Sequence, residues 1–174
     1  MRHDDLTVGV VIEVPEPWGE DLTEWRIGFG DPHAEKILAH ITLLAPVRMS
    51  AQQFADLPSR LNAECGRLPA FAMALGPIGT FRPVSPVVYL QAHADADALP
   101  LTQAAVWRAA GEPPQRHAFV AHCTVAMDVP DSVLDAAADA LRDYTAAWQV
   151  SEVLVLTRDP DGYWQRRFSV PLLG

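Results

Sequence analysis

The chain has 174 residues, of which 49% are hydrophobic and 20% charged, so a mainly disordered protein is excluded. Its 13 basic and 22 acidic residues give a net charge of −9. This charge excludes a protein that coats long nucleic acid, because nucleic acid phosphates need a basic surface. No apolar run reaches the length of about 18 residues that a membrane span needs.

The cysteines and the N-terminal residues bear on the cellular compartment. Cys65 and Cys123 form no disulfide framework and no C-x-x-C motif, which favours a reducing compartment. Residues 1–5 lead into a short apolar strand and lack the apolar region and cleavage site of a signal peptide. We therefore expect a cytoplasmic protein that contacts no membrane.

The first half of the chain alternates apolar strands with helical patterns. In chain order we predict a strand at 7–14, a helix at 16–29, a strand at 39–44, a helix at 50–68, and strands at 70–78 and 87–92. Pro46 is expected to close the second strand. Ser50 and Gln53 form a capping-box pattern, and Pro58 is expected to kink or divide the helix that they begin.

The second half repeats this alternation and ends in a hairpin signal. We predict a helix at 97–110, a loop at 111–118, a strand at 119–127, a helix at 131–144, and strands at 149–156 and 163–171. Residues 159–162 read Asp-Pro-Asp-Gly, a turn signal between the last two strands. The mixture of helices and hairpin signals predicts an α+β fold with mostly antiparallel sheets.

Each half contains an apolar strand, then a strand with a His-x-Thr motif, then a helix. The motifs are His40-Ile41-Thr42 and His122-Cys123-Thr124. Residues i and i+2 of a strand share a face, so each strand presents an imidazole and a hydroxyl on one side. Random placement of histidines and threonines would give two or more such motifs in roughly 3% of chains. The repeat predicts two related lobes within one bilobal domain, residues 1–174.

Two histidines and two threonines suit phosphodiester cleavage without a metal. A neutral imidazole can take a proton from the attacking oxygen, while a protonated one gives a proton to the leaving oxygen. Threonine hydroxyls can donate hydrogen bonds to the charged phosphate oxygens. The six histidines show no i, i+4 pair and no H-E-x-x-H motif, so we expect no metal and no cofactor.

Residues 40–43 and 119–126 resemble the paired motifs of the two-histidine (2H) phosphoesterase superfamily. Within it, the similarity is greatest to the 2'-5' RNA ligase and cyclic phosphodiesterase group. The resemblance implies two mostly antiparallel sheets with pseudo-twofold symmetry, helices on the outer faces and a cleft between the lobes. It implies hydrolysis of a small cyclic phosphate or a 2'-5' linkage. It assigns His40 and His122 as the acid–base pair, and Thr42 and Thr124 to the phosphate.

The sequence departs from the pattern of that family at two points. Ala121 stands where relatives often have proline. Residues 126–128, Ala-Met-Asp, occupy the stretch where many relatives carry an arginine that meets the phosphate. Arg82, Arg116 and Arg158 lie in or beside predicted loops and are candidates to supply that cation.

Other candidate side chains also have simpler structural interpretations. Cys123 invites comparison with a Cys–His nucleophile, but strand alternation points it away from His122. His117 could approach the cleft, although a solvated loop histidine is the simpler interpretation. Five aromatic residues could stack on a base, with core packing the simpler expectation for each: Phe81, Tyr89, Trp107, Tyr163 and Trp164.

Two classes of function remain open from the sequence. One is a metal-independent phosphoesterase that acts on a small phosphodiester or nucleotide, RNA ends among the candidates. The other is a non-catalytic module that binds a nucleotide or phosphate in the same cleft. Two opposed proton-transfer groups favour the enzyme, and the missing arginine favours the binding module. In either case we expect no long nucleic acid as partner, and a monomer.

Overall fold

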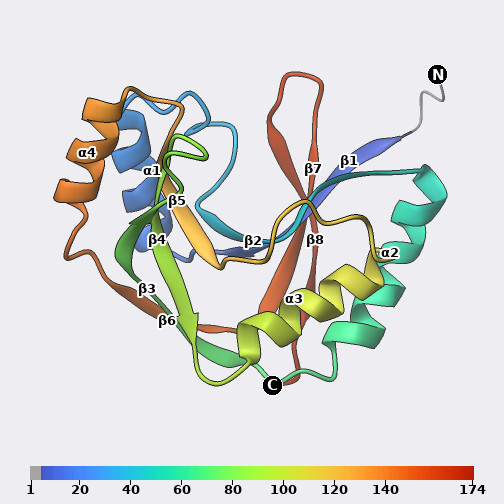
Figure 1. Ribbon diagram of the computed structural model, residues 1–174. Helices are drawn as coiled ribbons and strands as arrows, with labels where there is room; N and C mark the ends of the chain where they lie inside the picture. The colour runs from blue at the N-terminus through green and yellow to red at the C-terminus, as the bar shows by residue number, and fades with distance from the viewer. Residues whose placement is uncertain (1–4) are drawn as a thin grey trace.

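The computed structural model describes residues 5–174, which form eight strands and four helices (Figure 1). Residues 1–4, part of the N-terminal segment considered above, lie outside the described residues. The elements are β1 (Leu6–Glu13), α1 (Trp18–Gly28), β2 (His40–Met49), α2 (Ala51–Cys65), β3 (Phe71–Thr80), β4 (Val87–Ala94), α3 (Ala98–Ala109), β5 (His122–Met127), α4 (Asp131–Ala140), β6 (Ala146–Val150), β7 (Glu152–Arg158) and β8 (Trp164–Pro171). No helix within residues 5–174 is long and apolar enough to cross a membrane.

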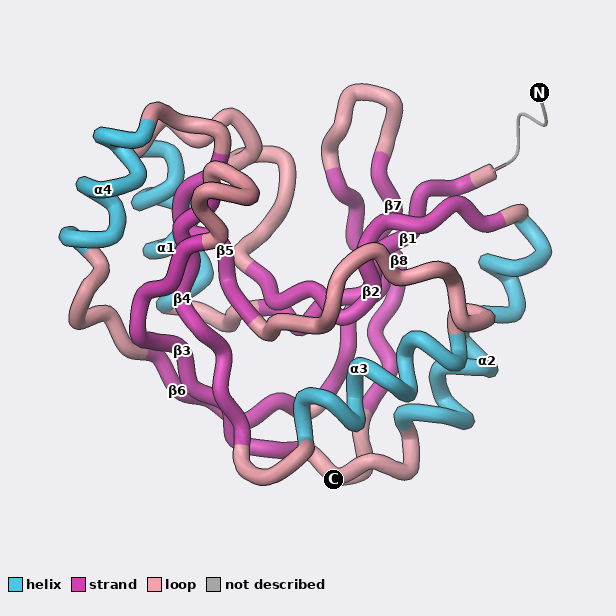
Figure 2. The backbone as a smooth tube through the Cα atoms, in the orientation of Figure 1, coloured by secondary structure: helices cyan, strands magenta, loops and turns pink. Residues whose placement is uncertain are grey.

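The strands form two four-stranded antiparallel sheets, one in each lobe (Figure 2). The first sheet has the order β2-β1-β7-β8, and the second has the order β5-β4-β3-β6. Every pair of neighbouring strands for which a register is defined is antiparallel. In both sheets the strand that carries a His-x-Thr motif lies at an edge. The α+β fold with two antiparallel sheets is therefore confirmed.

Two helices cross from one lobe to the other. Helix α1 connects β1 to β2 in the first sheet but packs against β5 of the second sheet. Helix α3 connects β4 to β5 in the second sheet but packs against β2 and α2. Consequently α1 and α4 lie on one side of the molecule, with α2 and α3 on the other (Figure 1). Each lobe is completed by a helix from the other, and one hydrophobic cluster contains core residues of both.

The expected strand end at Pro46 is wrong, and so is a division of the helix at Pro58. Strand β2 continues past Pro46 to Met49, because an edge strand can leave one side without hydrogen-bond donors. Its pairing with β1 is irregular around the proline. Helix α2 runs unbroken through Pro58. Its buried residues Leu57, Leu61 and Cys65 anchor the helix on both sides of the proline.

The capping box at the start of α2 is confirmed. The Gln53 amide N–H donates to the Ser50 hydroxyl at 3.2 Å, and the Ser50 amide N–H donates to the Gln53 side chain at 2.8 Å. The hairpin signal at residues 159–162 is also confirmed, since it joins β7 to β8. Helix α4 ends at Ala140, earlier than the predicted residue 144.

The predicted strand at 149–156 is in fact parts of two strands. Strand β6 ends at Val150 and pairs with β3 in the second sheet. Strand β7 begins at Glu152 and pairs with β1 in the first sheet. The chain therefore passes from one lobe to the other at Ser151. A continuous apolar run in the sequence predicts a buried segment, but it does not indicate which sheet each half of that segment joins.

Two glycines leave room for aromatic rings. A Cβ atom at Gly79 would lie 2.6 Å from the Tyr89 ring, and a Cβ atom at Gly9 would lie 3.2 Å from the Trp164 ring. Tyr89 is held on its other sides, because its ring centroid is 4.4 Å from that of Phe81 and 5.2 Å from that of His122. The Tyr89 ring thus cannot move without disturbing His122.

We expect Gly79→Ala to lower the free energy of unfolding by about 1–3 kcal/mol, the usual cost of overpacking. Urea denaturation measures this loss. The control is Gly28→Ala at the end of α1, where an added Cβ meets no atom within 4 Å. Equal stability of the two variants would show that the Tyr89 ring is free to shift.

Candidate functional site

The two His-x-Thr motifs occupy equivalent places in the two lobes. His40 is the first residue of β2, and His122 is the first residue of β5. Strand β5 therefore begins three residues later than the predicted start at residue 119. Ile41 and Cys123 are fully buried, whereas the motif histidines and threonines are half-buried. The predicted alternation of faces is confirmed on both strands.

Both imidazoles are held by the same local hydrogen bond. The Nδ1–H of His40 donates to the Leu38 carbonyl at 2.7 Å, and that of His122 donates to the Val120 carbonyl at 2.6 Å. A backbone carbonyl can only accept, so Nδ1 carries the proton in both rings. In the neutral imidazole, Nε2 is then the free basic nitrogen. The two motifs therefore follow the pseudo-twofold symmetry of the lobes even in the hydrogen bond made by each Nδ1.

Two neighbouring cavities form the predicted cleft. The first, of about 340 Å³, is lined by His40 and Thr124, and the second, of about 650 Å³, by Thr42 and His122. Each cavity thus takes its histidine from one motif and its threonine from the other. Because His40 and Thr42 share a face of β2, the two cavities lie next to each other. All four predicted site residues are brought to this cleft.

The first cavity is rich in cations, and we call it the basic cavity. Its wall includes the side chains of Arg26, His33, Lys36 and Arg158. The Arg26 guanidinium is buried and pairs with the buried Asp31 carboxylate at 2.8 Å. Within residues 5–174, no carboxylate lies within 4 Å of the Lys36 or Arg158 charge.

The three arginines considered as replacements for the missing cation have different positions. Arg158 lines the basic cavity, and Arg116 lines the second cavity. Arg82 instead pairs with Asp131 at 3.6 Å and with Asp135 at 2.9 Å on helix α4, and it lines neither cavity. Asp128, which follows the second motif, pairs with His33 at 2.7 Å.

Sequence reasoning missed Arg26 and Lys36. Arg26 lies in the last turn of helix α1, where a basic side chain is expected at the surface, and its partner Asp31 comes five residues later, beyond the helix end. Lys36 lies in the segment between α1 and β2, which has no motif. The only available signal was that Lys36 is the single lysine of the chain.

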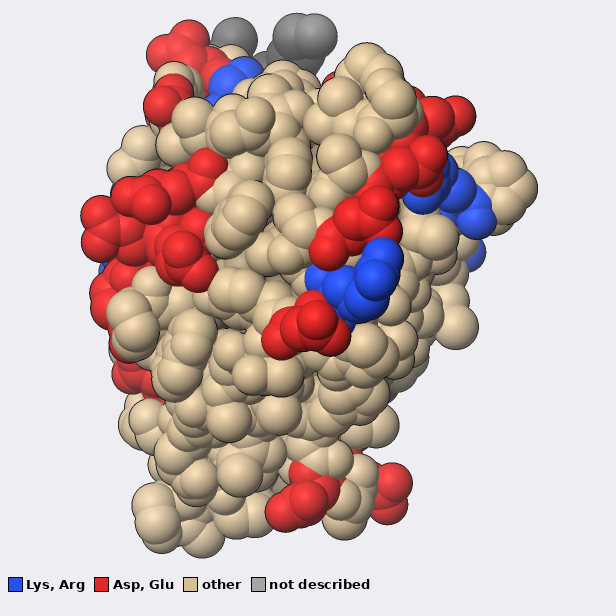
Figure 3. Space-filling model, turned by 90° about the vertical axis from the view of Figure 1, so that its left-hand side faces the viewer, with Lys and Arg blue, Asp and Glu red and all other residues tan. Residues whose placement is uncertain are grey.

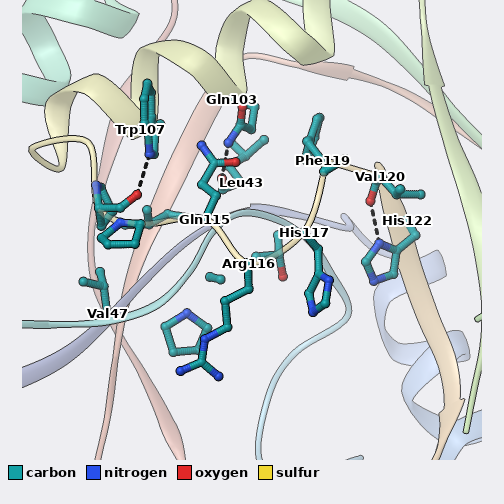
Figure 4. A pocket seen from close by; sticks show the side chains of 17 residues that line it. Leu43, Val47, Gln103, Trp107, Gln115, Arg116, His117, Phe119, Val120 and His122 are labelled. Carbon is teal, nitrogen blue, oxygen red and sulfur yellow. Dashed lines mark hydrogen bonds between the residues drawn. The ribbon is translucent and has the colours of Figure 1, made fainter. Parts of the chain in front are cut away.

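The second cavity has mostly apolar walls, and we call it the apolar cavity. It lies between the second half of β2, helix α3 and the loop at residues 113–120 (Figure 4). Trp107 closes one side, with its indole N–H donating to the Pro113 carbonyl at 2.8 Å. Arg116 and His117 extend from the loop on the same side as His122 (Figure 4). His117 thus reaches the cleft wall, although it is exposed.

Aromatic side chains surround the second histidine. The ring centroid of Phe81 is 4.9 Å from that of His122, with the rings nearly perpendicular. Tyr89 is opposite Thr124 in the register of β4 and β5, so it lies on the cleft face of the sheet. Trp107 and Trp164 line the apolar and basic cavities. Core packing is confirmed for Trp164, which also packs against a small buried cluster. Tyr89 and Trp107 instead face the cleft.

The pKa values of both histidines are lower than the ordinary value. Burial is the main cause that lowers the pKa of His40 to about 4, and the positive charges of Arg26 and His122 act in the same direction, against the Leu38 hydrogen bond. Burial also lowers the pKa of His122, against its bond to Val120. A charge on His122 is felt at His40, so the two imidazoles are electrostatically coupled.

The thiol beside the second histidine belongs to the core. Cys123 is fully buried, and burial raises the pKa of its thiol to about 11. Because a thiolate is the reactive form, this thiol is inert near neutrality. Among residues 5–174, no group of three or more His, Cys, Asp or Glu side chains is arranged to hold a metal ion.

Comparison with known proteins agrees with this geometry. A family model described as the 2'-5' RNA ligase superfamily matches residues 14–162. The chain is 26% identical over 127 residues to proteins of Bacillus cytotoxicus and Bacillus cereus that are both named "Putative phosphoesterase". In each case the aligned region covers 73% of both chains.

Solved structures share the fold over nearly the whole chain. Escherichia coli LigT complexed with 3'-AMP superposes with a TM-score of 0.68 at 16% identity, covering 98% of this chain and 100% of LigT. The protein TT0787 of Thermus thermophilus gives a TM-score of 0.59 at 19% identity, covering 97% and 98% of the two chains. At such identities the likeness concerns the fold alone. Since the family model spans most of the chain and both His-x-Thr motifs, this protein belongs to the 2'-5' RNA ligase superfamily, as its paired motifs predicted.

Proposed function

We propose that the protein is a metal-independent phosphoesterase that hydrolyses a small cyclic phosphate or a 2'-5' phosphodiester, such as a 2',3'-cyclic nucleotide. The observation that carries this proposal is the pair of imidazoles at one cleft, each with Nδ1 held by a carbonyl and Nε2 free. One residue must accept a proton and the other must donate one, and this pair can do both. The names of the Bacillus relatives also support a phosphoesterase.

The surroundings of the two histidines favour different roles. The positive charge of Arg26 disfavours a second charge on His40, so His40 is the base that takes the proton of the attacking water. His122, whose pKa is lowered by burial alone, donates its Nε2 proton to the leaving oxygen. The water oxygen bonds to phosphorus as the ester bond to the leaving oxygen breaks. In the reverse reaction the two roles exchange.

The threonines and the cavities complete this proposal. Thr42 and Thr124 donate their hydroxyl hydrogens to the non-bridging phosphate oxygens, whose charge grows in the transition state. The cleft accommodates a small nucleotide, and solved complexes of LigT contain 3'-AMP, ATP or NADP+. The proposal treats the chain as one bilobal unit that acts as a monomer in the cytoplasm.

A second candidate is a non-catalytic module that binds a nucleotide or phosphate in the same cleft. It is favoured by Asp128, a carboxylate in the stretch where many relatives carry an arginine. Adenosine 2',3'-cyclic phosphate distinguishes the two candidates. An enzyme opens the ring to a monophosphate, which chromatography detects. A binding module binds the cyclic compound, as calorimetry would show, but leaves it unchanged.

Removing either imidazole tests the acid–base assignment. We expect His40→Ala and His122→Ala each to lower kcat/KM by about 10²–10⁴-fold, the usual contribution of one general acid or base. His93→Ala is the control, because His93 is exposed on β4 and lines neither cavity. A His122→Ala variant as active as the parent would overturn the two-histidine assignment.

Removing a threonine hydroxyl should cost less than removing an imidazole. Thr42→Val and Thr124→Val each delete one hydrogen bond to the phosphate and leave both proton-transfer groups in place. We expect the loss in kcat/KM to remain below that of either histidine variant, measured with the same cyclic nucleotide. A larger loss from a threonine would mean that its hydroxyl takes part in proton transfer.

Chelation tests the absence of a catalytic metal. We expect hydrolysis to continue at the same rate after dialysis against EDTA, because the reaction proposed uses only imidazoles and hydroxyls. Loss of turnover in EDTA that added zinc or manganese restores would contradict this prediction.

The lowered pKa values predict a kcat/KM maximum on the acidic side of neutrality. Activity should rise with pH through about 4, as His40 loses its proton and becomes a base. As the pH rises further, activity should fall again, because His122 loses the proton that it must donate. The midpoint of this fall should lie below pH 6.5, the ordinary pKa of histidine. A profile of kcat/KM from pH 3.5 to 9 measures both limbs. A maximum at pH 8 would contradict the proposed protonation states.

A further inference from the structure

The basic cavity concentrates positive charge in an acidic protein. Arg26 is neutralised by Asp31, and the Asp128 carboxylate at His33 adds one negative charge. Lys36 and Arg158 therefore leave the cavity with a surplus of positive charge. The outer face over α1 and α4 has the opposite character, with clustered Asp and Glu and few Lys or Arg (Figure 3).

The β7–β8 hairpin contacts the backbone of Lys36 and the side chain of Arg158. The Trp164 amide N–H donates to the Lys36 carbonyl at 2.8 Å, which ties the segment before β2 to the hairpin. The Arg158 guanidinium lies 5.9 Å from the centroid of the Trp164 ring. Trp164 itself packs over Gly9 and against a small buried cluster on the first sheet. These contacts place both residues at the hairpin side of the basic cavity.

The carboxylate that follows Arg158 in the chain does not compete for these cations. Asp159 follows Arg158 directly, but its carboxylate accepts the amide N–H groups of Asp161 at 3.0 Å and Tyr163 at 2.8 Å. It also accepts the Gln165 side-chain amide at 3.3 Å. These hydrogen bonds commit Asp159 to the hairpin turn, so Lys36 and Arg158 remain available to an external anion.

We infer that Lys36 and Arg158 form a subsite for a second phosphate of the substrate, next to the phosphate that is cleaved. The subsite shares its cavity with His40 and Thr124, so one ligand can reach both. An arginine fork and a lysine point charge are the side chains that suit phosphate oxygens. This inference rests on the proposed function and narrows the substrate to a nucleotide with a phosphate in addition to the scissile one.

The neighbouring cavity gives the substrate a direction. Its mostly apolar wall, which includes Trp107 and Phe119, suits an uncharged organic group such as a nucleobase. The charged end of the substrate then lies toward the β7–β8 hairpin, and the apolar end toward the loop at residues 113–120. The scissile phosphate lies between them, at the two histidines.

Calorimetric titration of two nucleotides tests the subsite without requiring turnover. We expect adenosine 3',5'-bisphosphate to bind at least about tenfold more tightly than adenosine 3'-phosphate, because the extra phosphate gains charge-assisted hydrogen bonds. Lys36→Met and Arg158→Gln should each remove most of this difference, because each should weaken binding of the bisphosphate by a larger factor than binding of the monophosphate. Added salt should reduce the difference.

A matched variant controls for the net charge of the protein. Arg60→Gln removes one exposed cation on α2, which lines neither cavity, and it should leave the tenfold difference intact. Equal affinities for the two nucleotides, or an Arg60→Gln effect as large as that of Arg158→Gln, would overturn the subsite. Because binding is measured, the subsite can be tested even if the protein does not hydrolyse cyclic nucleotides. An active enzyme with equal affinities for the two nucleotides would overturn the subsite but not the proposed function.

Discussion

Burial of alternate side chains from β2 and β5 in one shared core is the constraint on which the cleft depends. Ile41 and Leu43 enter that core from one lobe, and Cys123 and Val125 enter it from the other. A shift of register by one residue would turn every side chain of a strand to the opposite face. The hydrophobic effect therefore sets the direction of the imidazoles and hydroxyls, although none of these polar groups contributes to it.

The crossing of α1 and α3 explains why the two lobes share electrostatic as well as hydrophobic contacts. Helix α1 brings Arg26 from the first half of the chain against β5, where its charge adds to the effect of burial in lowering the pKa of His40. The guanidinium can be buried there because Asp31 balances its charge. Arg26 is placed by helix packing and not by a motif, and its charge lowers the pKa of His40 without a corresponding effect on His122.

Patterns with a local cause predicted the structure well. Strand alternation placed the four motif side chains, and the Ser50–Gln53 capping box and the turn at residues 159–162 were predicted from spacing alone. Features decided by tertiary contacts were not predictable in this way. The change of sheet at Ser151 and the passage of β2 through Pro46 depend on which strands are neighbours. The basic cavity depends on Lys36 meeting the distant hairpin through Trp164.

The hydrogen bond from each Nδ1–H to a carbonyl has a consequence for successive turnovers. A carbonyl cannot take up that proton, so neither ring can pass its proton to a neighbour behind it. Under the proposed mechanism, one hydrolysis leaves His40 protonated and His122 neutral. The free enzyme must then exchange these protons with solvent before it can act again. Until it does so, the cleft is prepared to join the product ends that it has just separated.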